Sequence, residues 1–273
     1  MPEFRAPDGA SLAYDAYEPT TDNRKPTTIL WVGGWSDHRI RWKRPAECLA
    51  AAGYPVYLLD QRGHGDSGGI RGHLSRFSQL LADLQAFRRF VRSKVDAPQI
   101  LLGHSFGGLV VLRYLEMQPT DPVAAAVLSS PWLGLAQPVP LLKRLAARPL
   151  ADLWPSLPLE TAIDARVLTR DPAAAAAYRA DAAVHHVMTP GAWREIQWAQ
   201  RVVPADAHRI KVPLLFLLAG KDALVDAPLA RSFATGLQGS VETRWYEEMY
   251  HELLLDTEWE RPLGDALAFL KRH

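Results

Sequence analysis

The chain has 273 residues, of which 48% are apolar, and a formal net charge of +1. This length suits one large domain, or one domain with an insertion, and the apolar share is ample for a sizeable core. The interspersed charges argue against a nucleic-acid-binding surface, and the single cysteine, Cys48, excludes an internal disulfide and a cysteine-based metal cluster.

The predicted elements begin with a hairpin, because short apolar runs around Phe4 and over 12–17 flank the turn signal Pro7-Asp8-Gly9. Unbroken apolar runs, typical of parallel strands covered on both faces, follow at 27–32, 55–59, 99–102 and 123–128. Amphipathic helices are predicted between and after them, at 41–52, 77–91 and 106–117. This alternation predicts an α/β fold with a mostly parallel central sheet and helices on both faces.

Two sets of charged residues accompany these helices, and we expect both to face solvent. The first set, around the helix at 77–91, contains Arg76, Asp83, Arg88, Arg89 and Arg92. The second set, at the start of the helix at 41–52, contains Arg39, Arg41, Lys43 and Arg44. A phosphate headgroup is the alternative partner for this second set.

The sequence changes character after Ser130-Pro131, where helical pieces broken by prolines replace the buried strands. Asp171-Pro172 and Thr189-Pro190 each predict a helix start, since a capping side chain precedes a proline at the first helical position. We therefore predict that residues 132–207 form an inserted helical cap, and that residues 1–131 and 208–273 form the core. The core resumes with strands predicted at 212–218 and 241–246 and helices at 228–237 and 260–271.

Ser105 is the candidate nucleophile, because it stands in a G-x-S-x-G pattern between an apolar strand and a helix. Gly103 and Gly107 remove side chains that would clash in such a sharp turn. The following residue, Phe106, opens the helix, so its N–H is free to bind an oxyanion that forms above the serine.

A serine hydroxyl needs a base to accept its proton and usually an acid to orient that base. Asp222 follows one late strand and His251 follows the next, so both belong to the carboxyl edge of the sheet beside Ser105. Asp226 is the alternative acid, although it reads better as a helix cap. The remaining candidate histidines are predicted to have structural or surface positions: His64, His104, His185 and His186.

Residues 63–68 match the G-x-G-x-x-G dinucleotide-binding pattern. That pattern requires a helix that opens at the glycines, and here the helical periodicity begins only at Phe77. We therefore expect no cofactor, and no metal site is predicted either.

The serine segment Gly103–Gly108 and the loop Asp60–Ser67 (D-Q-R-G-H-G-D-S) resemble motifs of α/β-hydrolases of the monoacylglycerol lipase and lysophospholipase group. The acid and base segments, 220–226 and 250–252, match as well, and the resemblance covers nearly the whole length. The segment Arg71–Phe77 (R-G-H-L-S-R-F) is similar to bacterial lysophospholipase L2-type proteins.

The resemblance implies the α/β-hydrolase fold and a second oxyanion donor that follows an H-G pair in the family. Val32-Gly33-Gly34 occupies that position here, so Gly34 is the expected donor and Trp35 the alternative. The missing histidine at Val32 is a departure from the family pattern.

These residues predict a serine hydrolase that cleaves carboxylic esters through a Ser-His-Asp acyl-enzyme mechanism. The alternatives are a small-ester carboxylesterase, a proline-iminopeptidase-like enzyme or C–C hydrolase on the same scaffold, and a non-catalytic binding module. An aminopeptidase would need a cap carboxylate to hold the substrate's amine, for which the candidates are Glu160, Asp164, Asp181 and Glu195.

The apolar cap predicts a single-chain acyl ester, a monoacylglycerol or lysophospholipid, as the substrate. We expect the pocket to be lined by Trp35, Trp132, Leu133, Leu135, Trp154, Leu157 and Tyr250. No apolar run reaches the roughly 18 residues of a membrane span and residues 1–17 lack a signal-peptide pattern, so we expect a cytoplasmic protein that contacts membranes at most transiently, through the cap. No nucleic-acid partner is expected.

Overall fold

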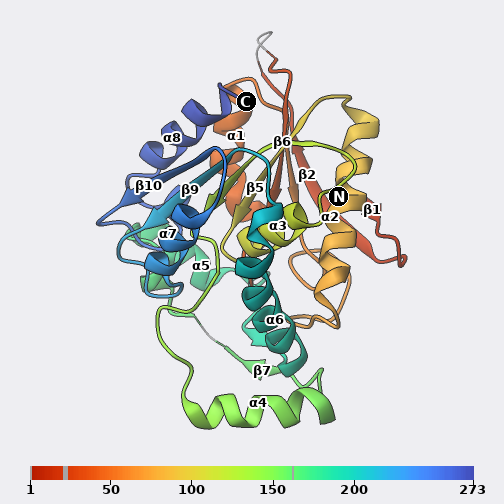
Figure 1. Ribbon diagram of the computed structural model, residues 1–273, viewed down its shortest axis with the longest axis vertical. Coiled ribbons are helices and arrows are strands. Elements are labelled where there is room, and N and C mark those ends of the chain that lie inside the picture. Colours follow the sequence, from red (N-terminus) through yellow and green to blue (C-terminus); the bar gives the residue numbers. More distant parts are fainter. Residues whose placement is uncertain (1, 21–23, 162) are drawn as a thin grey trace.

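A computed structural model describes residues 2–20, 24–161 and 163–273, and at its centre lies an eight-stranded sheet with the order β1-β2-β4-β3-β5-β6-β9-β10 (Figure 1). In chain order the strands of this sheet are Glu3–Arg5 (β1), Ser11–Tyr17 (β2), Thr28–Val32 (β3), Val56–Leu59 (β4), Gln99–His104 (β5), Val123–Ser129 (β6), Leu214–Ala219 (β9) and Val241–Tyr246 (β10). Strand β2 pairs antiparallel with β1 and with β4, and the other neighbouring strands are parallel. The predicted hairpin and the predicted α/β-hydrolase fold class are confirmed.

Helices cover both faces of the sheet. The helices outside the segment between β6 and β9 are Lys43–Ala51 (α1), Phe77–Lys94 (α2), Phe106–Glu116 (α3), Ala227–Gly236 (α7) and Glu260–Leu270 (α8), and two 3₁₀ turns lie at Arg39–Trp42 and Leu253–Leu255. Along β3 the side chains alternate: Leu30 and Val32 belong to the apolar core with α2, α3 and α7, whereas Ile29 and Trp31 belong to the core with α1 and α8. Burial on both faces explains why the strands read as unbroken apolar runs.

The segment between β6 and β9 is mainly helical and lies above the carboxyl ends of the parallel strands. Its elements are Leu141–Leu153 (α4), Leu159–Glu160 (β7), Ala165–Val167 (3₁₀), Pro172–Ala180 (α5), Val187–Met188 (β8), Pro190–Asp206 (α6) and Ala207–Arg209 (3₁₀). Both predicted helix starts are confirmed, since Asp171 accepts hydrogen bonds from two backbone N–H groups of α5 and Thr189 accepts one from α6. Helix α4 lies farthest from the sheet (Figure 1). The cap limits at 132 and 207 remain a prediction.

The solvent-exposed position predicted for Asp83 and Arg88 on α2 is wrong. Asp83 accepts two hydrogen bonds from Arg62, at 2.6 and 2.7 Å. Arg88 is 1% exposed and donates to the Gln99 side chain at 3.0 Å and to the Tyr114 hydroxyl at 2.7 Å. Both charges are buried because partners from distant parts of the chain satisfy them.

In the described part of the chain, no helix combines the length and the apolar character that a membrane span requires.

Candidate active site

Ser105 occupies a strained turn between β5 and α3. Its backbone has φ 51° and ψ −114°, a conformation that costs a non-glycine residue about 1–3 kcal/mol. Gly107 permits the turn, because a Cβ atom there would lie 2.1 Å from the Val32 carbonyl oxygen. The turn places Ser105 in the wall of a cavity at the carboxyl edge of the sheet.

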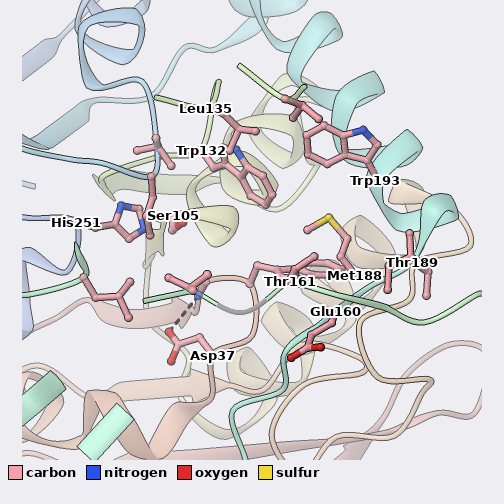
Figure 2. Close-up of a pocket in the computed structure, with 18 of the residues that line it drawn as sticks. Asp37, Ser105, Trp132, Leu135, Glu160, Thr161, Met188, Thr189, Trp193 and His251 are labelled. Atoms are coloured by element: carbon pink, nitrogen blue, oxygen red, sulfur yellow. Dashed lines mark hydrogen bonds between the residues drawn. The ribbon is translucent and has the colours of Figure 1, made fainter. Parts of the chain in front are cut away.

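The structure brings His251 and Asp222 together beside Ser105. His251 Nδ1 lies 2.7 Å from Asp222 Oδ2, and both side chains are almost fully buried. The other carboxylate oxygen of Asp222 accepts hydrogen bonds from the N–H groups of Leu224 at 2.9 Å and Val225 at 3.0 Å. Figure 2 shows the His251 imidazole next to Ser105 at one end of the cavity.

The alternative acid, Asp226, has another partner. It precedes α7 and accepts a hydrogen bond from the Leu229 N–H at 2.8 Å, as a helix cap does. This geometry favours Asp222 over Asp226 as the partner of His251.

The charge of Asp222 dominates the electrostatics of His251. Burial alone would lower the pKa of His251, but the charge and hydrogen bond of Asp222, helped by Glu252 and Asp37, raise that pKa above its ordinary value. The neighbouring His104 has the opposite response, because burial and the proximity of His251 hold its pKa well below the usual range. Burial also lowers the pKa of His64, to about 4.

The two expected oxyanion donors from the 33–35 loop differ in their hydrogen bonds. A Cβ atom on Gly34 would lie 3.4 Å from the Ser105 Cβ, so this loop passes directly beside the serine. The Gly34 N–H, however, donates to Asp37 Oδ2 at 3.2 Å. Among the described residues, none accepts a hydrogen bond from the Trp35 N–H. Phe106 is the first residue of α3, and its N–H has no earlier helical carbonyl to bond.

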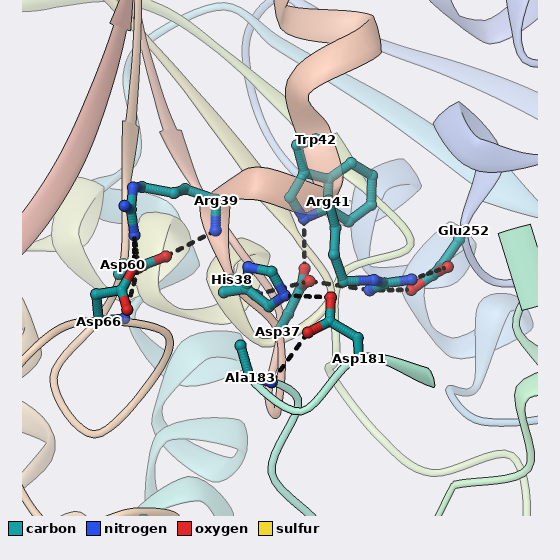
Figure 3. Close-up of polar contacts among 10 residues, drawn as sticks. All are labelled: Asp37, His38, Arg39, Arg41, Trp42, Asp60, Asp66, Asp181, Ala183 and Glu252. Carbon is teal, nitrogen blue, oxygen red and sulfur yellow. Dashed lines mark hydrogen bonds and ion pairs between the residues drawn. The ribbon is translucent and has the colours of Figure 1, made fainter. Parts of the chain in front are cut away.

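A buried ionic network lies under this loop (Figure 3). Arg41 donates to Asp37 Oδ1 at 2.9 Å and to both carboxylate oxygens of Glu252 at 2.7 Å. Burial opposes ionisation of Asp37, but the positive charge of Arg41 and the hydrogen bonds of Trp42 and Arg41 hold its pKa below the usual value. The network links the loop beside Ser105 to the residue that follows His251.

The solvated position predicted for the basic run is therefore wrong for Arg41, and also for Arg39. Arg39 is 4% exposed and forms ion pairs with Asp60, with Asp15 at 3.1 Å and with Asp66 at 2.8 Å. The side chains of Arg39 and Arg41 turn inward because each forms ion pairs with buried or partly buried carboxylates.

A cavity of about 610 Å³ extends from Ser105 under the cap, within the range of small-molecule sites. Most of its wall is apolar, including Trp132, Leu135 and Trp193, with Met188 on the same side (Figure 2). Its polar lining residues include Asp37, Arg41, Glu252, Tyr178 and Glu160.

Three of the seven predicted pocket residues line this cavity, namely Trp35, Trp132 and Leu135. The other four, Leu133, Trp154, Leu157 and Tyr250, are described by the structure but do not line it. Leu133 packs in the core below the cap. Trp154, at the end of α4, is 60% exposed because that end of the helix points into solvent.

Several cavity residues do not follow from the sequence patterns. They come from the cap, from the 3₁₀ turn before α1 and from the loops after β9 and β10: Arg41, Val139, Ala147, Ile163, Leu168, Tyr178, Met188, Trp193, Leu224 and Glu252. Leu150 and Leu159, two leucines of the cap, also line the cavity. The apolar content of the cap signalled such a pocket, but the direction of each side chain depends on how the cap helices are oriented.

Known proteins resemble this chain over most of its length. Residues 24–258 match the family described as serine aminopeptidase, S33. A monoacylglycerol lipase of Mycolicibacterium smegmatis is 33% identical over 276 residues, which cover 99% of this chain and 96% of that protein. Phospholipase YtpA of Bacillus subtilis is 30% identical, over 92% of this chain and 97% of that protein. The crystal structure of Paleococcus ferrophilus monoacylglycerol lipase matches with a TM-score of 0.82 at 27% identity, covering 95% of this chain and 98% of that one.

Proposed function

Because this chain belongs to the serine aminopeptidase S33 family of α/β-hydrolases, we propose that it cleaves single-chain acyl esters through a covalent acyl-enzyme on Ser105. The family and its named relatives make the chain a carboxylic ester hydrolase. The observation that carries the mechanism is the pair His251–Asp222, 2.7 Å apart, beside a strained serine in the wall of an apolar cavity.

In the proposed mechanism, Ser105 Oγ attacks the ester carbonyl carbon while His251 Nε2 accepts the hydroxyl proton. The C–O bond to the alcohol then breaks, and His251 returns the proton to the departing oxygen. Water attacks the acyl-enzyme next, with His251 again as the base, and releases the fatty acid and Ser105. Asp222 keeps the Nδ1 proton in place, so that Nε2 is free to accept the proton of Ser105.

The tetrahedral oxyanion is proposed to bind the N–H groups of Phe106 and Trp35. Gly34 is the less suitable donor, because its N–H already serves the Asp37 carboxylate at 3.2 Å. Trp35 is the next residue along the same loop, and its N–H remains available to the substrate.

The apolar wall supports an acyl chain as the part of the substrate that the cavity encloses. Residues from the cap, among them Leu135, Met188 and Trp193, would cover this chain. Each buried methylene contributes about 0.8 kcal/mol of binding free energy, which corresponds to about a fourfold gain in specificity.

The polar part of the cavity lining, formed by Asp37, Arg41, Tyr178 and Glu252 and called the polar end here, supports a neutral hydroxylated alcohol as the leaving group. Arg41 is already paired with two carboxylates, those of Asp37 and Glu252, so this end carries a net negative charge that repels a phosphate. Tyr178 lies beside Arg41, and its buried hydroxyl has no partner among the described residues. Burial raises the pKa of Tyr178 to about 12, so the hydroxyl stays neutral and is free to bind a substrate hydroxyl. A monoacylglycerol therefore suits the site better than a lysophospholipid.

A chain-length series tests this substrate class. With glycerol esters from acetyl to palmitoyl below their micellar concentrations, we expect kcat/KM to rise about fourfold per added methylene until the cavity is full. At equal chain length, the glycerol ester should exceed the glycerophosphocholine ester. A rate that falls beyond acetyl would leave a small-ester carboxylesterase, and a preference for the phosphocholine ester would contradict the assignment of the polar end.

An aminoacyl arylamide is the matched control for the aminopeptidase alternative. Of the four cap carboxylates considered for holding an amine, three have protein partners: Asp164 binds Arg166, Asp181 binds His38, and Glu195 binds the Phe77 N–H. Glu160 lines the cavity. We expect the arylamide to be cleaved far more slowly than the acyl ester.

The raised pKa of His251 predicts the acid limb of the pH profile. The reaction needs the neutral imidazole, so kcat/KM should fall tenfold per pH unit below the pKa of His251 and level off above it. The midpoint should lie above about 6.5, the ordinary value for histidine. A profile from pH 5 to 9 on an uncharged ester, with circular dichroism over the same range as the control for folding, measures it. A midpoint below pH 6 would contradict the role of Asp222.

The cap also presents apolar side chains to the outside, and we propose that they contact lipid surfaces transiently. Leu145 is 62% exposed and Leu153 85% exposed, on the helix farthest from the sheet. The double variant Leu145→Ser and Leu153→Ser should lose co-sedimentation with phosphatidylcholine vesicles, whereas Leu229→Ser, at a 44% exposed position on α7, should not. Equal sedimentation of all three proteins would refute the contact.

A further inference from the structure

The side chain of Trp35 lies where the core, the serine turn and the cap meet. Its indole N–H donates to the carbonyl oxygen of Val187 in β8 at 3.2 Å. Three rings pack edge-to-face around it: His64 at 5.0 Å, Phe106 at 5.1 Å and His185 at 5.9 Å between ring centroids. His185 belongs to the cap and was predicted to lie on the surface, but here it fills the space between the cap and the core.

A second set of contacts fixes β8 against the core. Gly72, in the segment Arg71–Phe77, has φ +62°, and its carbonyl accepts a hydrogen bond from the Thr189 N–H at 2.9 Å. His73 Nδ1 lies 2.9 Å from the Thr189 hydroxyl, and the Phe77 N–H donates to Glu195 at 2.7 Å. The segment that resembles lysophospholipase L2-type proteins therefore binds the junction between β8 and α6.

We propose that the cap strand β8 positions the oxyanion hole, with the Trp35 indole as the connection and the segment Arg71–Phe77 as the anchor of β8. This inference rests on the proposed function, in which the Trp35 N–H binds the oxyanion. The Trp35 side chain is then a positioning group, separate in its action from the backbone N–H of the same residue.

Trp35 lies in the 33–37 loop between two sets of contacts, one at Gly34 and one at its own indole. The loop has no regular secondary structure, and Ser36, the next residue, has φ 63°. On one side of Trp35, the Gly34 N–H is fixed by Asp37. On the other, the indole is fixed by the Val187 carbonyl and the surrounding rings. Without the indole hydrogen bond, the Trp35 peptide group can rotate. Its N–H then no longer points to the position where the oxyanion forms during the reaction.

The variant Trp35→Phe tests this connection, because it removes the indole N–H and keeps an aromatic ring. We expect kcat on a monoacylglycerol to fall about tenfold, since displacing a catalytic group by a fraction of an ångström has an effect of this order, while KM changes less than about twofold. The affinity for an alkyl trifluoromethyl ketone, which forms an oxyanion on the serine, should fall by the same factor as kcat/KM. The affinity for the unreactive alkyl ether of glycerol should not change.

A second variant displaces β8 without altering Trp35. A Cβ atom on Gly72 would lie 2.2 Å from the Val187 carbonyl oxygen, so Gly72→Ala should move that acceptor and lower both kcat and ketone affinity. Gly9→Ala is the matched control, because Gly9 also has a positive φ, of 87°, but no atom within 4 Å of the added carbon. It should behave as the wild type does.

The outcomes separate this inference from the function on which it rests. If wild-type protein cleaves esters and Trp35→Phe keeps full kcat and ketone affinity, the connection is refuted and the mechanism stands. A change in KM alone would also refute it, because Trp35 would then be only a wall of the pocket. If the wild-type protein neither cleaves esters nor binds the ketone, the proposed function itself fails.

Discussion

Replacement of Ser105 by alanine is expected to lower kcat by at least about 10⁴-fold. The hydroxyl is the atom that forms the covalent intermediate, and an alanine leaves only the oxyanion donors and the cavity to accelerate attack by water. The protein should still fold, because the alanine methyl group fits in the space of the serine side chain and only the hydroxyl is lost. Hydrolysis of a medium-chain monoacylglycerol by purified protein measures the loss.

Ser93→Ala is the matched control for this substitution. Ser93 lies on α2, and its hydroxyl donates to the Phe90 carbonyl at 2.7 Å on an exposed surface. The control should keep the wild-type rate, and both variants should unfold near the wild-type temperature. Activity of Ser105→Ala above about a tenth of wild type would show that another group performs the chemistry.

Asp222→Asn should lower kcat by about 10⁴-fold with little change in KM. The Leu224 and Val225 N–H groups need an acceptor at one oxygen of this side chain, so the asparagine oxygen must remain there. Its NH₂ group then faces His251 Nδ1 and stabilises the tautomer that carries the proton on Nε2. That tautomer is unable to accept the proton of Ser105.

Asp226→Asn makes the same chemical change four residues away and serves as the control. Asp226 caps α7, and asparagine is an equally good cap, so activity and stability should stay near wild type. A greater loss in Asp226→Asn than in Asp222→Asn would assign the acid to Asp226 instead.

Periodicity and turn chemistry were sufficient to predict the core of this fold. The runs at 29–32 and 100–102 are apolar at every position because both faces of β3 and β5 are buried, as expected for a covered parallel sheet. Ser105, Asp222 and His251 each follow a strand of that sheet. Their proximity therefore follows from topology, since parallel strands end at one edge.

The cavity wall is less predictable, because it depends on how the cap helices are oriented rather than on their composition. Two apolar residues of the cap show this: Trp132 lines the cavity and Leu153 is 85% exposed, and no periodicity distinguishes them. Arg41 and Arg88 turn inward for a related reason. Their partners, Glu252 for the first and Tyr114 for the second, lie far away in the sequence.

The oxyanion donor shows how one side-chain contact changes a prediction. The family pattern directed attention to Gly34, the residue after Val32-Gly33. The Asp37 carboxylate folds back onto the Gly34 N–H at 3.2 Å, which the sequence alone does not reveal, and so favours Trp35.

The most direct test of Ser105 as the nucleophile is covalent labelling of the folded protein with an alkyl fluorophosphonate, followed by peptide mass mapping. With Ser105 as the nucleophile, we expect a single phosphonyl group per chain, on the peptide that contains Ser105, and no label on Ser105→Ala. The long-chain monoacylglycerol ether should slow the labelling by occupying the cavity. A label on any other residue, or no label on a protein that cleaves monoacylglycerols, would contradict the assignment of Ser105.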